Sequence, residues 1–316
     1  MTECDKVIKK GIITRDFLKE EIICGYTVTT KLKKTWAIEL DLLYEFKRVC
    51  DKYGLRWFAC AGTLLGAVRH GGFIPWDDDL DVCMPREDYE RLIKLYFCEF
   101  KTPYFLQTPY TDKEYCYSFA KLRNSNTSFA VEAFIESTMN QGIFLDIFPL
   151  DYSDIKEYLE RRKKIVKTIE KCSAFMSRNN KYIKNKHTDK AKEIKFHSSD
   201  NIKLYEEIQN IAMSSNKESC AHYSTEIVTI YEPKRKLWPK RCFDNIVQMP
   251  FCNCTINVPE GWDELLQIMY GNYMSFPPVE QRGRWHDSQF LNPDLSYLVI
   301  SEEYIKSLRE TSILED

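Results

Sequence analysis

Four aspartates lie within five positions of this chain, at Asp77, Asp78, Asp79 and Asp81. Ionised carboxylates this close together repel one another strongly unless a cation lies among them. The loop sequence GGFIPW precedes them, and the alternation of residues 80–84 predicts a strand that begins inside the cluster. Any fold of this chain must therefore hold several like charges together where a loop enters a strand.

Strand geometry predicts which of these carboxylates act together. Residues two apart on a strand project from the same face, so we expect Asp79 and Asp81 to point one way while Leu80 turns into the core. Two carboxylates on one face supply half of a metal site, and Mg²⁺ or Mn²⁺ is the oxygen-seeking ion that suits them. Asp77 and Asp78 are either additional site residues or loop acids that are solvated or act as caps.

Asp146 is the expected third carboxylate. It is the single acid in the apolar run IFLDIF, which we expect to form a strand over residues 143–148. An ionised Asp buried there would be very costly without a compensating charge. A bound cation supplies that charge in one interpretation. In the other, Asp146 lies at a strand end and pairs with a Lys or Arg.

Gly62 and Thr63 are the expected phosphate contacts. They follow the short aromatic-rich run 55–61, which we expect to be a buried strand, and they begin an apolar segment, LLGAV, with helical spacing. Backbone N–H groups, a hydroxyl and a helix N-terminus at such a turn suit an anionic phosphate. Together with the carboxylates and their cation, these parts predict phosphoryl transfer.

The same residues resemble the signature of the LicD family. The matching segments are GTLLGAVRH and GFIPWDDDLD within 62–81, KLR at 121–123 with Thr127, LDIFPLD at 145–151, and YGNYM at 270–274 with Pro277 and Pro278. The resemblance extends over roughly residues 36–286. One departure is Asn272, where the family more usually has an acid.

This resemblance implies a fold. Members of the family resemble the nucleotidyltransferase (DNA polymerase β-like) fold. We therefore expect an α+β structure: a mixed sheet flanked by helices, with additional helical and β elements in the C-terminal part. The expected division is an N-terminal extension over 1–34, a nucleotidyltransferase-like catalytic core over 35–150, and a C-terminal part over 151–316 that completes the active-site cleft.

The resemblance also implies a reaction. The LicD family includes phosphocholine transferases that act on lipopolysaccharide or teichoic acid, and the fukutin-related proteins. It implies transfer of phosphocholine, or a similar alcohol phosphate, from a CDP-choline-like donor to a hydroxyl of a glycan or lipid-linked glycan acceptor. Asp79, Asp81 and Asp146 are then the catalytic and metal-binding residues, and Mg²⁺ or Mn²⁺ is the cofactor.

Further residues are expected to contact the substrate. Lys121 and Arg123 alternate on an expected strand, so they share a face on which both meet phosphate, a solvated sheet edge being the alternative. Arg69 and His70 precede the Gly-Gly loop and are expected near the substrate, although a structural His70 fits the sequence nearly as well. Trp76 either stacks on a base or a quaternary ammonium group, or packs the loop.

A cationic loop follows Pro277 and Pro278, with Arg282, Arg284 and His286. If this loop folds back over the cleft, we expect Arg282 and His286 to hold a diphosphate. If it lies outside, it is ordinary charged surface.

Charge is balanced over the chain but segregated along it. The 316 residues include 45 Lys and Arg against 47 Asp and Glu, a formal net charge of −2, which argues against a protein that coats nucleic acid. Residues 156–203, however, carry fifteen basic and six acidic side chains. We interpret this basic segment first as a solvated helix face, next as a surface for a polyanionic acceptor or an anionic membrane, and last as a nucleic-acid patch.

The cysteines and the hydropathy indicate where the protein works. The twelve cysteines form no CxxC pair, and several occupy apolar positions, so we expect free thiols in a reducing compartment. No apolar signal segment begins the sequence, and no stretch approaches the ~18 uncharged residues of a membrane span. We expect a cytoplasmic protein with peripheral contact at the inner face of the membrane.

The coarse pattern of helices and strands follows from periodicity and caps. We expect helices over residues 35–54, 87–97, from the capping box of Asp154 and Glu157 onward, around 204–211, and from Pro259 at the first helical position to Gly271. Expected strands lie at 104–107 and 118–123, and residues 225–258 are expected to be rich in strands.

Two other functions fit the sequence. On the same fold, the transferred unit is ribitol phosphate or a nucleotidyl group instead. A rival of another class is a non-catalytic nucleotide- or glycan-binding module. Four intact acids around one turn argue against that rival, because a site that has lost its activity has no reason to retain their repulsion.

Overall fold

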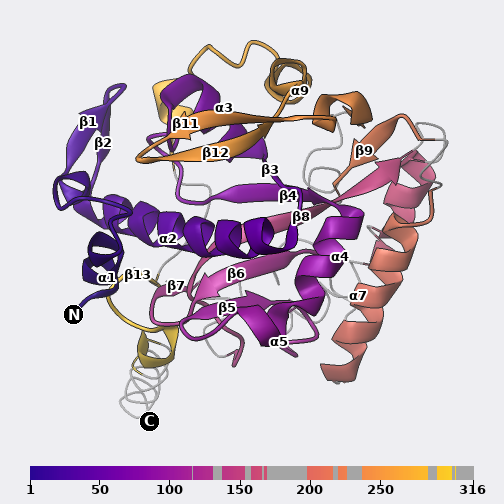
Figure 1. Cartoon of the computed structure of the whole chain (residues 1–316), viewed down its shortest axis with the longest axis horizontal. Helices are drawn as coiled ribbons and strands as arrows, with labels where there is room; N and C mark the ends of the chain where they lie inside the picture. The colour runs from indigo at the N-terminus through magenta and orange to yellow at the C-terminus, as the bar shows by residue number, and fades with distance from the viewer. Residues whose placement is uncertain are drawn as a thin grey trace, which may run out of the picture.

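The computed structural model of the chain describes residues 1–115, 117–130, 137–153, 158–165, 167–168, 198–215, 220–225, 237–283, 290–300 and 303. Its helices (Figure 1) are α1 (Glu3–Lys9), α2 (Thr30–Tyr53), α3 (Ala61–His70), α4 (Arg86–Lys94), α5 (Tyr96–Glu99), α7 (Ser198–Ala212) and α9 (Trp262–Tyr270), with 3₁₀ turns η1 (Asp16–Leu18), η4 (Lys240–Phe243) and η5 (Val279–Gln281). Its strands are β1 (Glu21–Ile23), β2 (Tyr26–Val28), β3 (Phe58–Ala59), β4 (Asp81–Pro85), β5 (Tyr104–Gln107), β6 (Ala120–Asn124), β7 (Ser128–Ala130), β8 (Ile143–Ser153), β9 (His222–Ser224), β10 (Trp238–Pro239), β11 (Ile246–Phe251), β12 (Cys254–Pro259) and β13 (Phe290–Asn292).

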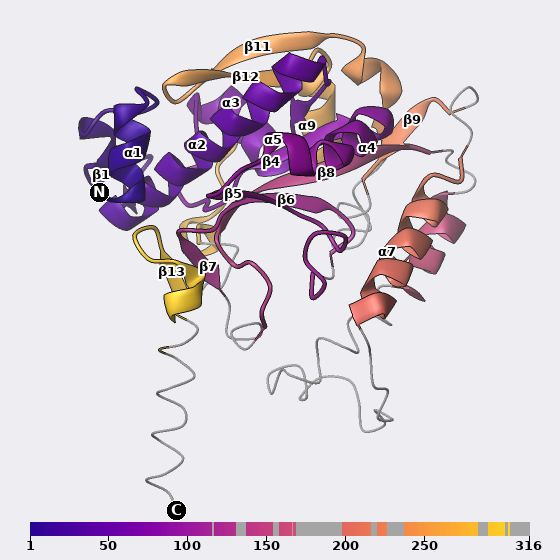
Figure 2. The same ribbon diagram turned by 60° about the horizontal axis from the view of Figure 1, so that its bottom comes forward.

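A seven-stranded sheet forms the centre of the molecule. Its strands follow the order β5–β6–β8–β4–β3, and β9 with β10 continues from the far end of β8. Strands β4 and β8 run parallel, whereas the other pairs are antiparallel. Helices α2, α3, α4 and α5 lie on the same side of β5 and β6 (Figure 2). The expected α+β fold, a mixed sheet flanked by helices, is confirmed.

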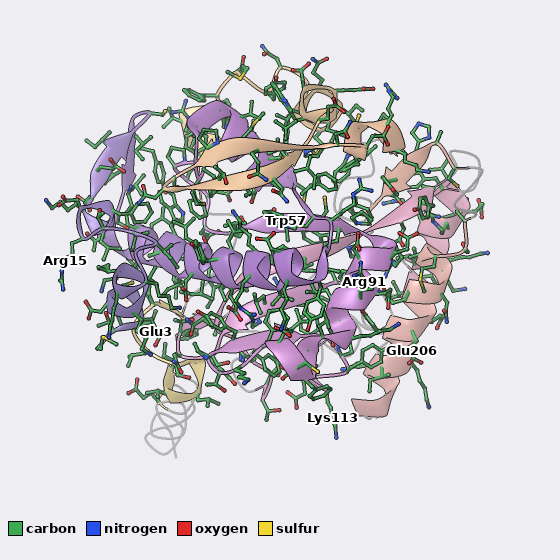
Figure 3. All side chains as sticks on the ribbon, viewed as in Figure 1. Glu3, Arg15, Trp57, Arg91, Lys113 and Glu206 are labelled. Atoms are coloured by element: carbon green, nitrogen blue, oxygen red, sulfur yellow. The ribbon has the colours of Figure 1, made fainter. Side chains whose placement is uncertain are left out.

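Helix α2 is the long element that crosses the sheet (Figure 1). The hydroxyl of Thr29 accepts the N–H of Leu32 at its start, and Gly54 ends it in the left-handed conformation at φ +60°, as the sequence predicts. Its apolar face is buried against β8 and β6. Phe46 of this face meets the fully buried Trp57 edge-on at 5.4 Å, near the middle of the molecule (Figure 3). Charged side chains such as Arg15 lie at the rim.

Segments from the N-terminal and C-terminal parts of the chain pack beside this sheet. Residues 1–33, for which periodicity gave no assignment, include α1, η1, the β1–β2 hairpin and the first turn of α2. The helix expected over 35–54 therefore begins earlier, at Thr30. The antiparallel hairpin β11–β12 packs on α3 and β3. Strand β8 runs through residue 150, where the sequence places the end of the catalytic core, so the C-terminal part shares the central sheet through β9 and β10.

The helix start expected at Pro259 is wrong. Pro259 is the last residue of β12, paired with Ile246, and Gly261 is the N-cap residue of α9, which begins at Trp262. A proline can end a strand at its edge as readily as it begins a helix, because neither position requires its missing N–H. The capping box of Asp154 and Glu157 lies outside the described residues.

The expectations on thiols and membrane spans can be compared with the described residues. Ten cysteines there are free thiols, and Cys116 and Cys172 lie outside them. Among the described helices, none combines the length and the apolar character needed to cross a bilayer.

Candidate active site

The first turn of α3 is fastened to the start of β4. The hydroxyl of Thr63 accepts the backbone N–H of Asp81 at 2.7 Å, in a buried position. Ala61, the first residue of α3, has a φ of +46°, so the chain turns sharply between β3 and the helix. The first turn of a helix leaves backbone N–H groups without intrahelical acceptors. Strand β3, α3 and β4 thus bring those N–H groups of residues 62 and 63 beside the acidic cluster, as the sequence predicts.

The carboxylates of Asp77, Asp78 and Asp79 form a compact group. One oxygen from each lies within 4.8 Å of the others, with Asp77 and Asp78 buried and Asp79 half-buried. Gly62 lies against this group, because a Cβ on it would stand 2.7 Å from a carboxylate oxygen of Asp77. Burial, and then the charge of Asp79, raises the pKa of Asp77 well above its ordinary value. Asp77 and Asp78, which the sequence left open, are therefore part of the cluster.

Asp81 and Asp146 lie side by side on neighbouring strands. They are directly paired in the parallel register of β4 and β8, and the N–H of Asp146 donates to the carbonyl of Leu80 at 2.9 Å. Burial raises the pKa of Asp81 well above its ordinary value, and the charges of Asp79 and Asp146 raise it further. The sheet therefore brings Asp146 beside Asp81, from the interior of β8 rather than from a strand end.

Lys121 is the cation beside Asp146. Its ammonium lies 2.5 Å from the carboxylate of Asp146, and both side chains are 7% exposed. It also stands 3.5 Å from the centroid of the Phe144 ring. Asp146 therefore has a compensating Lys, which is the alternative that the sequence left open. The ion pair places Lys121 at the cluster, where its charge also acts on Asp81.

Arg123 shares a face of β6 with Lys121 but has other partners. Its guanidinium donates to the side-chain oxygen of Gln107 and to the carbonyl of Gly142, and it is 4% exposed. These bonds hold β6 to β5 and to the residue before β8. The expectation that Arg123 contacts phosphate is therefore not supported by its position, which is that of a buried structural cation.

Arg69, His70, Trp76 and Arg282 meet around Phe276. The Phe276 ring stacks on His70 at 5.7 Å, and the guanidiniums of Arg69 and Arg282 lie 5.2 and 5.4 Å from its centroid. Arg282 also lies 5.1 Å from the ring of Trp76. The C-terminal loop that carries Arg282 thus folds back onto α3 and onto the loop that leads to the acids.

These contacts hold the C-terminal loop in place. Arg69 donates to the carbonyls of Tyr273 and Ser275 at 2.8 and 3.3 Å. Arg282 donates to the carbonyls of Pro277 and Cys24 at 2.9 and 3.2 Å. The meeting of these side chains at the exposed Phe276 ring was not foreseen, because only the fold brings residue 276 to residue 76. Arg284 and His286 lie outside the described residues.

Glu39 is a further acid that the sequence analysis missed. It lies in the middle of α2, is 1% exposed, and has its pKa raised well above the ordinary value by burial and then by the charges of Asp79, Asp78 and Asp77. A signal was present in the sequence, since Glu39 interrupts the apolar run that begins at Trp36. A helix elsewhere in the chain, however, cannot be assigned to this site without the tertiary structure.

The cluster fits a hard divalent cation. Every donor is a carboxylate oxygen, which is the ligand type that Mg²⁺ and Mn²⁺ prefer. Oxygens that share an octahedral Mg²⁺ lie about 3–4 Å apart, so the 4.8 Å group of Asp77, Asp78 and Asp79 requires only small side-chain rotations. Buried carboxylates in this number repel one another, and a cation removes that repulsion.

The sequence of this chain is similar to those of known proteins. Residues 54–200, which include the acidic cluster, Lys121 and Asp146, match the family model described as LicD/FKTN/FKRP, nucleotidyltransferase domain. The lipopolysaccharide cholinephosphotransferase LicD of Haemophilus influenzae is 26% identical over 259 residues, which are 81% of this chain and 96% of that protein. An uncharacterized protein of Rickettsia prowazekii is 37% identical over 95 residues, 30% of this chain and 32% of that protein. Another uncharacterized protein, from Rickettsia typhi, is 44% identical over 48 residues, which are 15% of this chain and 16% of that protein.

Proposed function

Because residues 54–200 of this chain are a LicD family domain, we propose that the protein transfers phosphocholine, or a similar alcohol phosphate, from a CDP-activated donor to a hydroxyl of a cell-surface glycan precursor. The relative from Haemophilus influenzae is named for transfer of this group to lipopolysaccharide. The observation that carries the proposal is the gathering of Asp77, Asp78, Asp79, Asp81 and Asp146 beside the first turn of α3.

In this proposal the carboxylates hold the cation and the α3 turn holds phosphate. Asp79 and Asp81 are its principal ligands, with Asp77 and Asp78 beside them. A bound Mg²⁺ or Mn²⁺ supplies positive charge to the diphosphate of the donor. The backbone N–H groups of Gly62 and Thr63 donate to phosphate oxygens at the helix N-terminus. Arg69 and Arg282, beside Trp76, supply further positive charge from the C-terminal loop.

Asp146 is proposed to accept the proton of the acceptor hydroxyl. The hydroxyl oxygen forms a bond to the phosphorus that carries the alcohol, the bond from that phosphorus to CMP breaks, and CMP leaves with the electron pair. Lys121 fixes the Asp146 carboxylate by its ion pair and supplies one positive charge to the same region. No oxidant or further reactant is needed for this balance.

The test is release of CMP from CDP-choline by the full chain with Mg²⁺ and a candidate acceptor sugar. We expect Asp79→Asn and Asp81→Asn to lower the rate at least about a hundredfold, the scale of losing one key electrostatic group. Asp88→Asn is the matched control, because Asp88 pairs with Arg91 on α4, away from the cluster. Full activity of the Asp79 and Asp81 variants would contradict the assignment.

A donor panel decides which group is transferred. Incubation with CDP-choline, CDP-ribitol and a nucleoside triphosphate, followed by mass spectrometry of the acceptor, gives a different mass gain for each. We expect the phosphocholine gain. A nucleotidyl gain would instead indicate transfer of the nucleotide. Tight binding of a donor without metal and without any product would favour a non-catalytic binding module. We further propose that the reaction takes place in the cytoplasm, which the free thiols of the described residues support.

A further inference from the structure

Glu39 has a buried carboxyl group that forms no ion pair with the described residues. Its carboxylate is 1% exposed, and the Oε2 atom has no hydrogen-bond partner there. An ionised carboxylate in such a place costs several kcal/mol unless a cation or hydrogen-bond donors satisfy it. Packing in the middle of a long helix does not by itself explain why a buried glutamate, with this desolvation penalty, occupies the position.

Asp41 shows how the same helix satisfies a buried acid elsewhere. It is 3% exposed, and its two oxygens accept from the ammonium of Lys10 at 2.6 Å and the hydroxyl of Tyr104 at 2.7 Å. Asp41 and Glu39 lie only two residues apart but point to different surroundings. The contrast indicates that the partner of Glu39 is something other than a side chain of the described residues.

The position of Glu39 identifies its surroundings. Trp36, one turn earlier on α2, donates its indole N–H to the carbonyl of Asp77 at 3.0 Å. Residues three apart on a helix share a face, so Glu39 faces the loop of the acidic cluster. The influences on its carboxyl are burial and the four carboxylates of residues 77, 78, 79 and 81, each of which acts against ionisation. Glu39 is therefore a sixth acid beside the five aspartates, contributed by a separate element.

We propose that Glu39 is a positioning residue of the cation site, which accepts hydrogen bonds from water molecules held by the cation. Its carboxylate is not part of the compact group formed by Asp77, Asp78 and Asp79, and it comes from the separate helix α2. Mg²⁺ in proteins usually keeps several of its waters, and those waters require acceptors on the protein. This inference rests on the proposed cation site and adds to it the contribution of α2.

The affinity of the full chain for Mn²⁺, measured by isothermal titration calorimetry, tests the proposal without reference to activity. We expect Glu39→Gln to weaken Mn²⁺ binding about 10–100-fold, as loss of such outer carboxylates does. Asp79→Asn is the positive control and should weaken binding more. Asp41→Asn is the matched control on the same helix, and its Mn²⁺ affinity should stay at the wild-type value.

Thermal unfolding separates this role from a merely structural one. Glu39→Gln replaces a buried carboxyl group, whose Oε2 atom has no hydrogen-bond partner among the described residues, by an amide of the same shape. We therefore expect its Tm in EDTA to equal or exceed that of the wild type and its gain in Tm on adding Mn²⁺ to be smaller. Asp41→Asn should lower Tm equally with and without Mn²⁺. Glu39→Met, of similar size, gives the same comparison should the Gln variant not fold.

The outcomes distinguish this inference from the proposed function. Weak Mn²⁺ binding by Asp79→Asn together with wild-type binding by Glu39→Gln and Glu39→Met would overturn the role of Glu39 alone. Wild-type binding by all three variants would overturn the carboxylate cation site itself. A Glu39→Gln protein that loses Tm equally with and without Mn²⁺ and keeps its affinity would make Glu39 structural.

Discussion

Thr63 shows how one side chain joins the phosphate-binding turn to the acids. Its hydroxyl accepts the N–H of Asp81, so the start of α3 and the start of β4 are held together at 2.7 Å. The sequence predicted Thr63 as a phosphate contact. The structure adds a second role, because one lone pair of the hydroxyl is already engaged and its hydrogen can still be donated.

We expect Thr63→Val to lower the free energy of unfolding by about 1–3 kcal/mol. Valine has nearly the shape of threonine, but it leaves the buried N–H of Asp81 without its acceptor. Urea unfolding of the variant measures the loss, and Thr63→Ser, which keeps the hydroxyl, should lose less. Equal stability of Thr63→Val and wild type would contradict the assigned bond.

His70 is a residue whose protonation is disfavoured in the folded protein. Burial first, and then the neighbouring charge of Arg69, lowers the pKa of His70 from 6.5 to about 4. The neutral ring accepts the Nε–H of Arg69 on its Nε2 atom at 3.0 Å. A protonated ring cannot accept this bond, so His70 acts here as a neutral acceptor that orients Arg69.

The stability of the protein should therefore fall as the pH drops from about 6.5 towards 4, as far as His70 contributes. Between these pH values the unfolded chain binds a proton at His70 that the folded chain does not bind. Protonation therefore stabilises the unfolded state relative to the folded state. NMR titration of the imidazole should give a midpoint near 4, and in His70→Phe, which keeps an aromatic ring against Phe276, this pH-dependent loss should be absent. A midpoint near 6.5 would refute the prediction.

At the scale of elements, β4, β6 and β8 decide which charges meet. Register pairs Asp81 with Asp146 across β4 and β8, and Lys121 with Asp146 across β6 and β8. Each pairing follows from the sheet and not from separation in the sequence. Because β8 is the shared neighbour, Asp146 links the acidic cluster to the cation that partly balances it.

Lys121→Met should destabilise the protein by about 3–5 kcal/mol, because it leaves the buried carboxylate of Asp146 without its counter-charge. The double variant Lys121→Met/Asp146→Asn removes both charges and should recover part of that loss. Chemical denaturation of the two variants makes the comparison. If the double variant is no more stable than Lys121→Met, the ion pair is not the source of the loss.

At the scale of the whole molecule, a buried arginine connects three parts of the chain. Arg86 of α4 donates two bonds of 2.6 Å to the carboxylate of Asp151 in β8, and a third of 2.6 Å to the side chain of Gln209 in α7. Figure 2 shows α7 beside the sheet at the β9 end. The contact therefore attaches α7 to the sheet that carries the acids.

We expect Arg86→Met to lower the free energy of unfolding by about 3–5 kcal/mol and to increase hydrogen exchange in α7. Arg241→Met is the control, since Arg241 and Glu264 form a pair at the surface, 67% and 43% exposed, and such pairs contribute at most about 1 kcal/mol. Calorimetry and hydrogen exchange measure both effects. If Arg86→Met lowers the free energy of unfolding no more than Arg241→Met does, the role of this contact is contradicted.

The sequence alone determined the local features of this protein. It placed the end of α2 at Gly54, the strand at 104–107 and the acids before β4, because caps, alternation and like-charge repulsion act between near neighbours. It also indicated that Asp146 needs a compensating charge.

Only the tertiary structure decided which charge compensates which. The pairing of Lys121 with Asp146, the contribution of Glu39 from α2 and the meeting of Phe276 with Trp76 join residues far apart in the sequence. Register and helix packing fix such contacts, and both are set by burial of the whole apolar core rather than by any one segment.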